Sequence, residues 1–156
     1  MNIKHITVTL KYTFFIIILI TFSFTANSET SVQEIIKGRK ALFSKNYSTA
    51  KKVQTFISKG DFDKAKNLMF EMSENYKNLL EYFPENTKEG FKTEALPIIW
   101  ENKDEFNALM TKSSNDMIKL VSVIEDTESV DEVREVLTKM MWGNCKSCHS
   151  KFRAPH

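Results

Sequence analysis

Two cysteines and a histidine in the last part of the 156-residue chain are the side chains best able to do chemistry. They form the run Cys145-Lys-Ser-Cys148-His149, in which two residues separate the thiols and an imidazole follows at once. On an α-helix, Cys148 and His149 lie roughly 60° and 40° to either side of Cys145, so all three share one face. This spacing is typical of c-type haem attachment, in which the thiols form thioethers and the imidazole ligates iron. The motif therefore predicts a covalent haem with His149 as its proximal ligand.

The same cysteines allow two other interpretations. A reversible redox disulfide between Cys145 and Cys148 belongs beside a βαβ pattern, and no β-rich alternation is visible in the sequence. A zinc site could add His149 and His156 to the two thiols, although structural zinc sites usually have other spacer lengths. The chain has only these two cysteines, which excludes a disulfide framework. Detection of haem would separate the three readings.

The first residues resemble a secretory signal peptide rather than part of a folded domain. A lysine-containing start precedes an apolar run at residues 12–24, and small residues follow at Ala26 and Ser28. The alternative is an uncleaved membrane anchor, but the run is short of the roughly 20 residues that span a bilayer. We expect cleavage after Ser28, which makes residues 1–28 the leader and 29–156 one haem domain. Because haem attachment to such motifs in bacteria follows export, we expect the periplasm and no membrane association after cleavage.

The charge of the chain is nearly balanced. It has 22 Lys+Arg and 20 Asp+Glu, and two of the lysines lie in the predicted leader, which has no acidic residue. No basic stripe indicates nucleic acid, and no charged tail indicates a polyelectrolyte partner. The sequence shows no nucleophile with a general base and no pattern typical of a substrate cleft. We therefore expect a protein that is not an enzyme.

Four amphipathic helical patterns follow the leader. They cover residues 31–58, 61–83, about 93–124, and 129 through the haem motif. Capping boxes of the form S-x-x-E begin the first and the last at Ser31 and Ser129. Gly60 and Pro84 end the first and second helices. Short links between amphipathic helices predict an all-α, antiparallel up-down-up-down four-helix bundle, with the haem held between helices.

Three segments carry a resemblance to a known family. Residues 145–153, Cys-Lys-Ser-Cys-His-Ser-Lys-Phe-Arg, resemble C-K-x-C-H-x-x-[YF]-R of the cytochrome c′ family, the class II c-type cytochromes. Residues 93–101, Thr-Glu-Ala-Leu-Pro-Ile-Ile-Trp-Glu, are similar to its T-x-A-L-P-x-[IV]-W segment. Residues 38–43 resemble the first-helix stretch with an arginine and, four residues on, the residue that faces the distal side of the haem. The resemblance covers residues 30–153 and implies a four-helix bundle whose haem motif lies in the last helix.

The resemblance implies a role for each matching residue. Cys145 and Cys148 would hold haem c, and His149 would ligate its iron. Arg39 would pair with a haem propionate; its alternative is a solvated cation on the helix surface. Arg153 would lie one turn beyond His149 on the proximal side, where its charge would disfavour ferric iron. A cation there can also stabilise the end of the helix.

The distal side is where this chain departs from some relatives. They have a first-helix methionine that ligates the iron, whereas this chain has no methionine between Glu29 and Asp61. Phe43 occupies the matching place and cannot ligate iron, so we expect a five-coordinate, high-spin haem under an apolar lid. The alternative for Phe43, as for the apolar stripe that includes Tyr47, is plain core packing. Gly143 either lets a large group approach the backbone or is an ordinary helical glycine.

These features together predict a periplasmic monohaem cytochrome that carries one electron between redox partner proteins. The alternative is a haem protein that binds the diatomic gases NO or CO, because a vacant distal position would admit small uncharged ligands. A zinc- or thiol-based helical protein is the third reading. The resemblance also implies that a homodimer through the first two helices is common.

Overall fold

Helices make up most of the chain that the computed structural model describes, residues 32–127 and 129–155. In order, the elements are a helix over residues 32–58, α2 (Phe62–Leu79), 3₁₀ turns at Leu80–Tyr82 and Glu85–Thr87, α3 (Ile98–Glu101), α4 (Lys103–Asp126), α5 (Val130–Leu137), a π-helical stretch at Thr138–Trp142 and α6 (Gly143–Phe152). The predicted leader, its cleavage site and the capping box at Ser31 lie outside these residues. Within the described part of the chain, no helix has the length and apolar character needed to cross a membrane.

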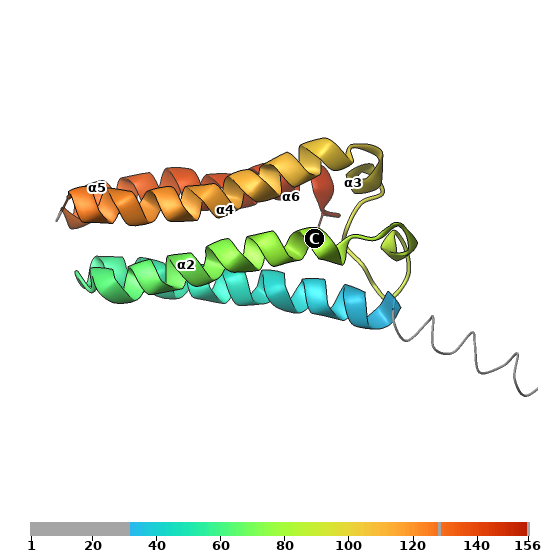
Figure 1. Ribbon diagram of the computed structural model, residues 1–156, viewed down its shortest axis with the longest axis horizontal. Helices are drawn as coiled ribbons and strands as arrows, with labels where there is room; N and C mark the ends of the chain where they lie inside the picture. Colours follow the sequence, from blue (N-terminus) through green and yellow to red (C-terminus); the bar gives the residue numbers. More distant parts are fainter. Residues whose placement is uncertain (1–31, 128, 156) are drawn as a thin grey trace, which may run out of the picture. The chain divides into compact units, whose positions relative to one another are not determined.

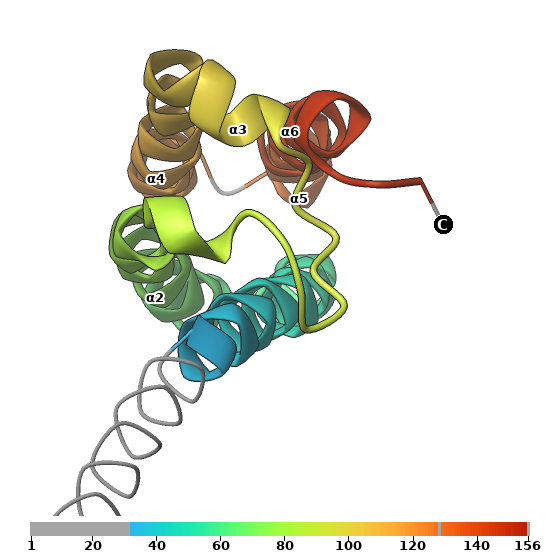
Figure 2. The same ribbon diagram turned by 90° about the vertical axis from the view of Figure 1, so that its right-hand side faces the viewer.

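The described residues from Ile35 onward form one compact unit. Its helices are arranged as four rods (Figure 1). The rods are the helix over 32–58, α2, α4, and the continuous run of α5, the π-helical stretch and α6 (Figure 1). Seen from the end, the four rods occupy the corners of a square, and the segment between α2 and α4 crosses the near end of the bundle (Figure 2). The predicted four-helix bundle is confirmed.

The core lies along the axis between the four rods. Between α2 and α4 the core contains a polar pair. The buried hydroxyls of Ser73 and Ser114 form a hydrogen bond of 2.8 Å there. Five methionines are buried in this core: Met69, Met72, Met110, Met117 and Met141. Thioethers fill irregular gaps well, which accounts for their use on several helices here.

The predicted end of the first helix and the predicted start of the second are confirmed, whereas α2 ends at Leu79 and a 3₁₀ turn, not α-helix, fills the residues before Pro84. Gly60 has a φ of +71°, a left-handed conformation that favours glycine after a helix end. The side chain of Asp61 accepts a hydrogen bond from the Lys64 backbone N–H at 3.4 Å and so caps α2. The tight turn makes the first helix and α2 antiparallel neighbours.

The predicted capping box at Ser129 is only half right. The Ser129 hydroxyl accepts from the backbone N–H of Glu132 at 3.3 Å, as expected for an N-cap. The Glu132 carboxylate does not reach back to the Ser129 N–H; it accepts instead from the Thr127 hydroxyl at 3.0 Å. Thr127 also accepts from the Ser129 N–H through its hydroxyl, so it takes the place of the reciprocal bond.

The prediction of one helix from about Thr93 to Ile124 is wrong at its start. Helix begins at Ile98, and it breaks at Asn102, which has φ −122° and ψ 50° between α3 and α4. Pro97 disfavours helical geometry in Leu96, the residue before it, and residues 93–96 are not helical, with Ala95 in an isolated bridge to Arg153. Sequence periodicity alone did not reveal that these residues have hydrogen-bonding partners elsewhere in the chain.

The last rod changes its helical form just before the cysteines. The stretch Thr138–Trp142 is π-helical, and α6 begins directly after it at Gly143. A wider turn shifts the phase of every later residue on the helix, and such turns occur often at functional sites. The change in phase therefore helps to set which face of α6 is turned inward.

Candidate haem site

A cavity of about 790 Å³ lies between the first helix, the extended residues 93–95 and α6. Its volume is within the roughly 300–1,000 Å³ typical of cofactor sites. Its lining is mainly apolar and includes Phe43, Phe83, Phe106, Met110, Trp142 and Phe152. Every site residue that the sequence predicted lies on its wall: Cys145, Cys148, His149, Arg39, Phe43 and Arg153.

The α6 helix places the two thiols and the imidazole at this cavity. Cys145 and Cys148 are half-buried and unbridged, and His149 lies one residue further along the helix. Burial raises the pKa of the Cys148 thiol to about 11 and also raises that of Cys145. The surroundings of both sulfur atoms therefore favour a neutral group over a thiolate. The thioether that each cysteine would form with haem is neutral at every pH, so these surroundings suit a covalently bound haem.

The two other interpretations of the cysteines receive no support from the geometry. Among residues 32–127 and 129–155, no three His, Cys, Asp or Glu side chains converge as a metal-ion site would require. His156, the fourth ligand of the zinc reading, lies outside those ranges. The same ranges contain no strand apart from an isolated bridge, so the βαβ setting of a thioredoxin-like disulfide is missing there.

Arg39 is the most deeply buried charged group at the cavity, with only 2% of its surface exposed. Its guanidinium donates to the Thr87 hydroxyl and the Thr87 carbonyl, both at 3.1 Å, and to the Tyr82 carbonyl at 3.4 Å. It also donates to the Thr93 hydroxyl. The alternative of a solvated surface cation is therefore wrong.

The charge of Arg39 has no acidic counterpart in the described ranges. None of the ion pairs there includes it, and burial lowers its pKa to about 10. The guanidinium lies 4.9 Å from the ring centre of Phe83 and 5.8 Å from that of Trp100, which offsets part of the desolvation. A buried cation beside a cavity is costly unless an anion joins it. The apolar lining and the buried cation together therefore fit a ligand with an apolar body and carboxylate substituents, such as a haem with its propionates.

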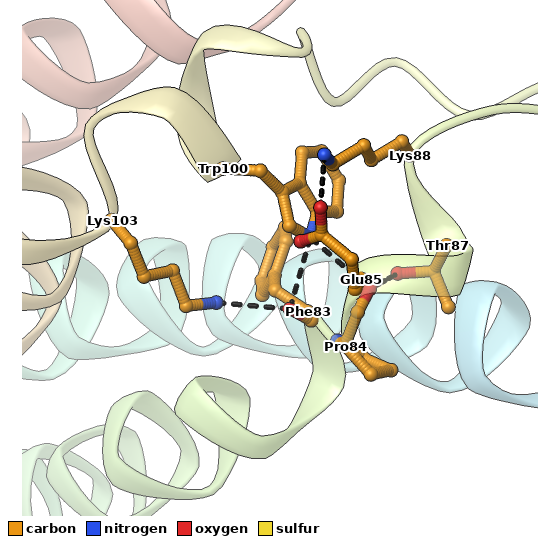
Figure 3. A network of polar contacts seen from close by, with 7 residues as sticks. All are labelled: Phe83, Pro84, Glu85, Thr87, Lys88, Trp100 and Lys103. Carbon is orange, nitrogen blue, oxygen red and sulfur yellow. Dashed lines mark hydrogen bonds and ion pairs between the residues drawn. The ribbon is translucent and has the colours of Figure 1, made fainter.

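The loop after α2, which includes Thr87, is itself held by Trp100 of α3 and Lys103 at the start of α4 (Figure 3). Trp100 donates its indole N–H to the carbonyls of Phe83 and Pro84, both at 3.1 Å, and Lys103 donates to the Phe83 carbonyl at 3.0 Å. Thr87 then donates its hydroxyl to the Pro84 carbonyl at 2.8 Å. The tryptophan of the T-x-A-L-P-x-[IV]-W segment thus fixes the loop that receives Arg39, a role that its sequence position did not reveal.

Gly38, beside Arg39, has a packing role that the sequence reading missed. A Cβ added there would lie 2.5 Å from the Cε1 atom of Tyr82, which is closer than real contacts allow. Only glycine lets the first helix approach the Tyr82 ring, and this approach brings Arg39 to the Tyr82 carbonyl. Gly143 differs, because a Cβ there would meet nothing within 4 Å.

Phe43 lies on the cavity wall one turn after Arg39. Its ring is edge-on to that of Phe83, with centres 6.4 Å apart, and Phe83 in turn lies 4.6 Å from Phe106. The side chain is half-buried, so it belongs both to the aromatic packing and to the cavity surface. The position agrees with the predicted lid, whose effect on a ligand stays a prediction.

Arg153 ends α6 and forms an ion pair with Glu94, with 2.9 Å between Nε and Oε2. The extended residues before Pro97 bring Glu94 there, because Ala95 and Arg153 form an antiparallel bridge. No feature of the sequence indicated a role for Glu94, because it stands at the variable second position of the T-x-A-L-P-x-[IV]-W segment.

Other wall residues were also missed. The Tyr76 hydroxyl lies within hydrogen-bonding reach of the Cys145 thiol, and burial raises the pKa of this phenol. Asn144 donates to the Asp116 carboxylate at 2.8 Å and accepts from the Lys112 ammonium at 3.0 Å, which ties the start of α6 to α4.

Tyr47, in the apolar stripe of the first helix, is 56% exposed, and its ring lies edge-on to that of Trp142 on the cavity wall, with ring centres 6.1 Å apart. The core-packing alternative is wrong for this residue. Its spacing of four from Phe43 was a usable signal that both lie on one helix face.

The fold and the site together define a class: a four-helix bundle whose last helix presents Cys-x-x-Cys-His to an apolar cavity with a buried cation. The model of the Cytochrome C′ family matches residues 34–153. The chain belongs to the cytochrome c′ family, a family of haem c proteins.

Individual relatives agree with this assignment. A cytochrome c′ from Rhodopseudomonas palustris is 33% identical over 126 residues, which cover 78% of this chain and 82% of the relative. A solved structure of cytochrome c′ from that organism has a TM-score of 0.68 at 29% identity, covering 78% of this chain and 96% of the other. Cytochrome c′ from Thermochromatium tepidum has the same fold at 18% identity, with a TM-score of 0.68 and coverage of 80% and 97%.

Proposed function

We propose that this protein is a periplasmic monohaem cytochrome that carries one electron at a time between redox partner proteins. The observation that supports this most strongly is the convergence of Cys145, Cys148 and His149 on one apolar cavity whose opposite wall carries the buried Arg39. A bound haem would supply a one-electron couple of its iron. The protein would supply attachment, orientation and electrostatics, and no catalytic turnover is part of the proposal.

Each residue at the cavity has a role in the proposal. Cys145 and Cys148 attach the haem, and His149 is the protein ligand of the iron. Arg39 offers its guanidinium to a propionate while it stays bonded to Thr87. Phe43 covers the distal side and excludes water from it.

The compartment is part of the proposal as well. Lysines, an apolar run and small residues in positions 1–28 support export followed by cleavage after Ser28. Haem attachment to such motifs in bacteria follows export, so we place this step in the bacterial periplasm, away from the membrane, where the two thiols must stay reduced until the haem is attached. A homodimer through the first two helices stays a prediction that sedimentation of the purified protein would test.

The proposal is tested by making the full chain in a bacterial periplasm with intact haem-attachment machinery. We expect haem that stays bound on a denaturing gel, and the variant C145A/C148A should lose it. The variant S147A is the matched control, because Ser147 lies between the cysteines on the exposed side of α6. Unchanged haem staining in C145A/C148A, or none in the unaltered protein, would contradict the proposal.

A second candidate function, binding of NO or CO, is favoured by one observation. Phe43 faces the cavity from the first helix, where the sequence contains no methionine to occupy a sixth position. Optical spectra of the reduced protein with and without CO distinguish the candidates. A broad reduced band that shifts with CO would support an accessible, high-spin site. Sharp bands indifferent to CO would leave electron transfer alone.

A further inference from the structure

Two arginines on the cavity wall are held by adjacent residues of one extended segment. Thr93 accepts a hydrogen bond from Arg39 of the first helix, and Glu94 forms the ion pair with Arg153 at the end of α6. Glu94 and Arg153 both line the cavity that His149 also lines. The segment therefore joins the wall formed by the first helix to the wall formed by α6.

The Glu94–Arg153 pair is fixed through its backbone as well as its side chains. The Ala154 N–H donates to the Glu94 carbonyl at 2.8 Å, and the Leu96 N–H donates to the Phe152 carbonyl at 3.0 Å. The two side chains are 40% and 35% exposed, so the pair is partly shielded from water. Ordinary surface pairs contribute little because their long side chains must be ordered, and here the backbone already orders them.

From this geometry we propose that Glu94 is a positioning residue that neutralises Arg153 beside the His149 side of the cavity. In doing so it keeps the reduction potential of the bound iron below the value that Arg153 alone would set. The inference rests on the proposed haem attachment, and it concerns a residue for which the sequence assigned no role.

The physical reason is the sign of the charges around the iron. Reduction adds one electron to the cavity and makes or breaks no bond, so a nearby cation favours the ferrous state and a nearby anion favours the ferric state. Arg153 lies four residues, about one helical turn, after His149. A carboxylate 2.9 Å from its Nε cancels much of its field at longer range.

The test is a spectroelectrochemical titration of the haem-bearing full chain and its variants. E94Q should raise the midpoint potential, because it removes the negative charge next to Arg153, and R153Q should lower it, because it removes the positive charge next to Glu94. We expect each to change the ferrous-to-ferric ratio at a set potential by about two- to tenfold, where tenfold corresponds to 59 mV for a one-electron couple. The midpoint potential of the double variant E94Q/R153Q should lie close to that of the unaltered protein. The potential of E94D, which keeps the carboxylate, should also lie close to that of the unaltered protein.

Glu105 provides the matched control. Its carboxylate pairs with Lys151 of the same α6 helix at 2.6 Å, and neither residue is on the cavity wall. E105Q should therefore leave the potential nearly unchanged. The inference is overturned if E94Q shifts the potential no more than E105Q, or if the double variant keeps the full shift of either single one. Absence of covalent haem from the unaltered chain would instead refute the proposed function.

Discussion

Arg39 shows how one side chain can serve both the fold and the cofactor site. Its hydrogen bonds to Thr87 and Tyr82 attach the loop after α2 to the first helix, while its position on the cavity wall suits an anionic ligand. The lowered pKa of about 10 still leaves it a cation at neutral pH. A buried cation with neutral partners is tolerated more easily when a second, anionic partner arrives.

Phe43 carries a prediction at the scale of a single residue. Phe43→Ala should speed CO binding to the ferrous haem protein, because the ring no longer has to move from the cavity wall. If that displacement costs about 1.4 kcal/mol, its removal speeds binding about tenfold. Stopped-flow mixing with CO measures the rate.

The control for this substitution is Phe70→Ala, since Phe70 is 47% exposed on α2 and lies outside the cavity wall. An on-rate in Phe43→Ala equal to that in Phe70→Ala would mean that Phe43 is packing and not a lid.

At the scale of elements, the close approach of the first helix to the 3₁₀ turn Leu80–Tyr82 depends on one glycine. Gly38→Ala should destabilise the protein by about 1–3 kcal/mol, because the new methyl group would overlap the Tyr82 ring. Urea unfolding followed by circular dichroism measures the change.

Gly143→Ala is the matched control in the haem-free protein. Its backbone is helical and no protein atom lies near the new methyl group, so helix propensity should stabilise it by up to about 1 kcal/mol. Equal urea midpoints for the two variants would contradict the packing role of Gly38. Loss of haem uptake in Gly143→Ala alone would indicate that a bound haem packs against the backbone at Gly143.

The helix elements differ in how far their sequences determined them. Asp61 and Gly60 act through neighbours in the chain, so the start of α2 and the end of the first helix followed from local chemistry. The helix predicted from Thr93 failed because residues 94–96 bond to 152–154, a pairing that no local pattern contains.

At the scale of the whole molecule, the bundle is packed differently on its two sides. The α2–α4 side is closed by core side chains and the Ser73–Ser114 hydrogen bond, while the side between the first helix and α6 surrounds the cavity. A bound haem would contact mainly the second side. We therefore expect the two sides to respond differently to haem.

Comparison of the haem-bearing protein with C145S/C148S made without haem tests this expectation. Amide hydrogen exchange in residues 84–97 should slow at least about tenfold with haem, about 1.4 kcal/mol of local stability, whereas buried amides of α2 and α4 near Ser73 and Ser114 should change less. Equal protection of residues 84–97 in both forms would refute the view that haem and Arg39 order this segment together.

The sequence by itself determined the fold class, the end of the first helix, the starts of α2 and α5, and the face shared by Cys145, Cys148 and His149. These follow from spacing along one chain segment, where helical geometry converts sequence separation directly into direction. The resemblance to the family extended this to Arg39, Phe43 and Arg153, and all three lie on the cavity wall.

Only the tertiary structure decided which residues meet those side chains. Thr87 and Thr93 reach Arg39 across 48 and 54 positions of the chain, and Glu94 reaches Arg153 across 59. Such contacts depend on how the rods pack and where the connecting segment crosses the end of the bundle, and neither is encoded in a local period. The burial of Arg39 at the cavity wall is likewise a property of the assembled bundle, because several segments distant in the sequence cover this side chain.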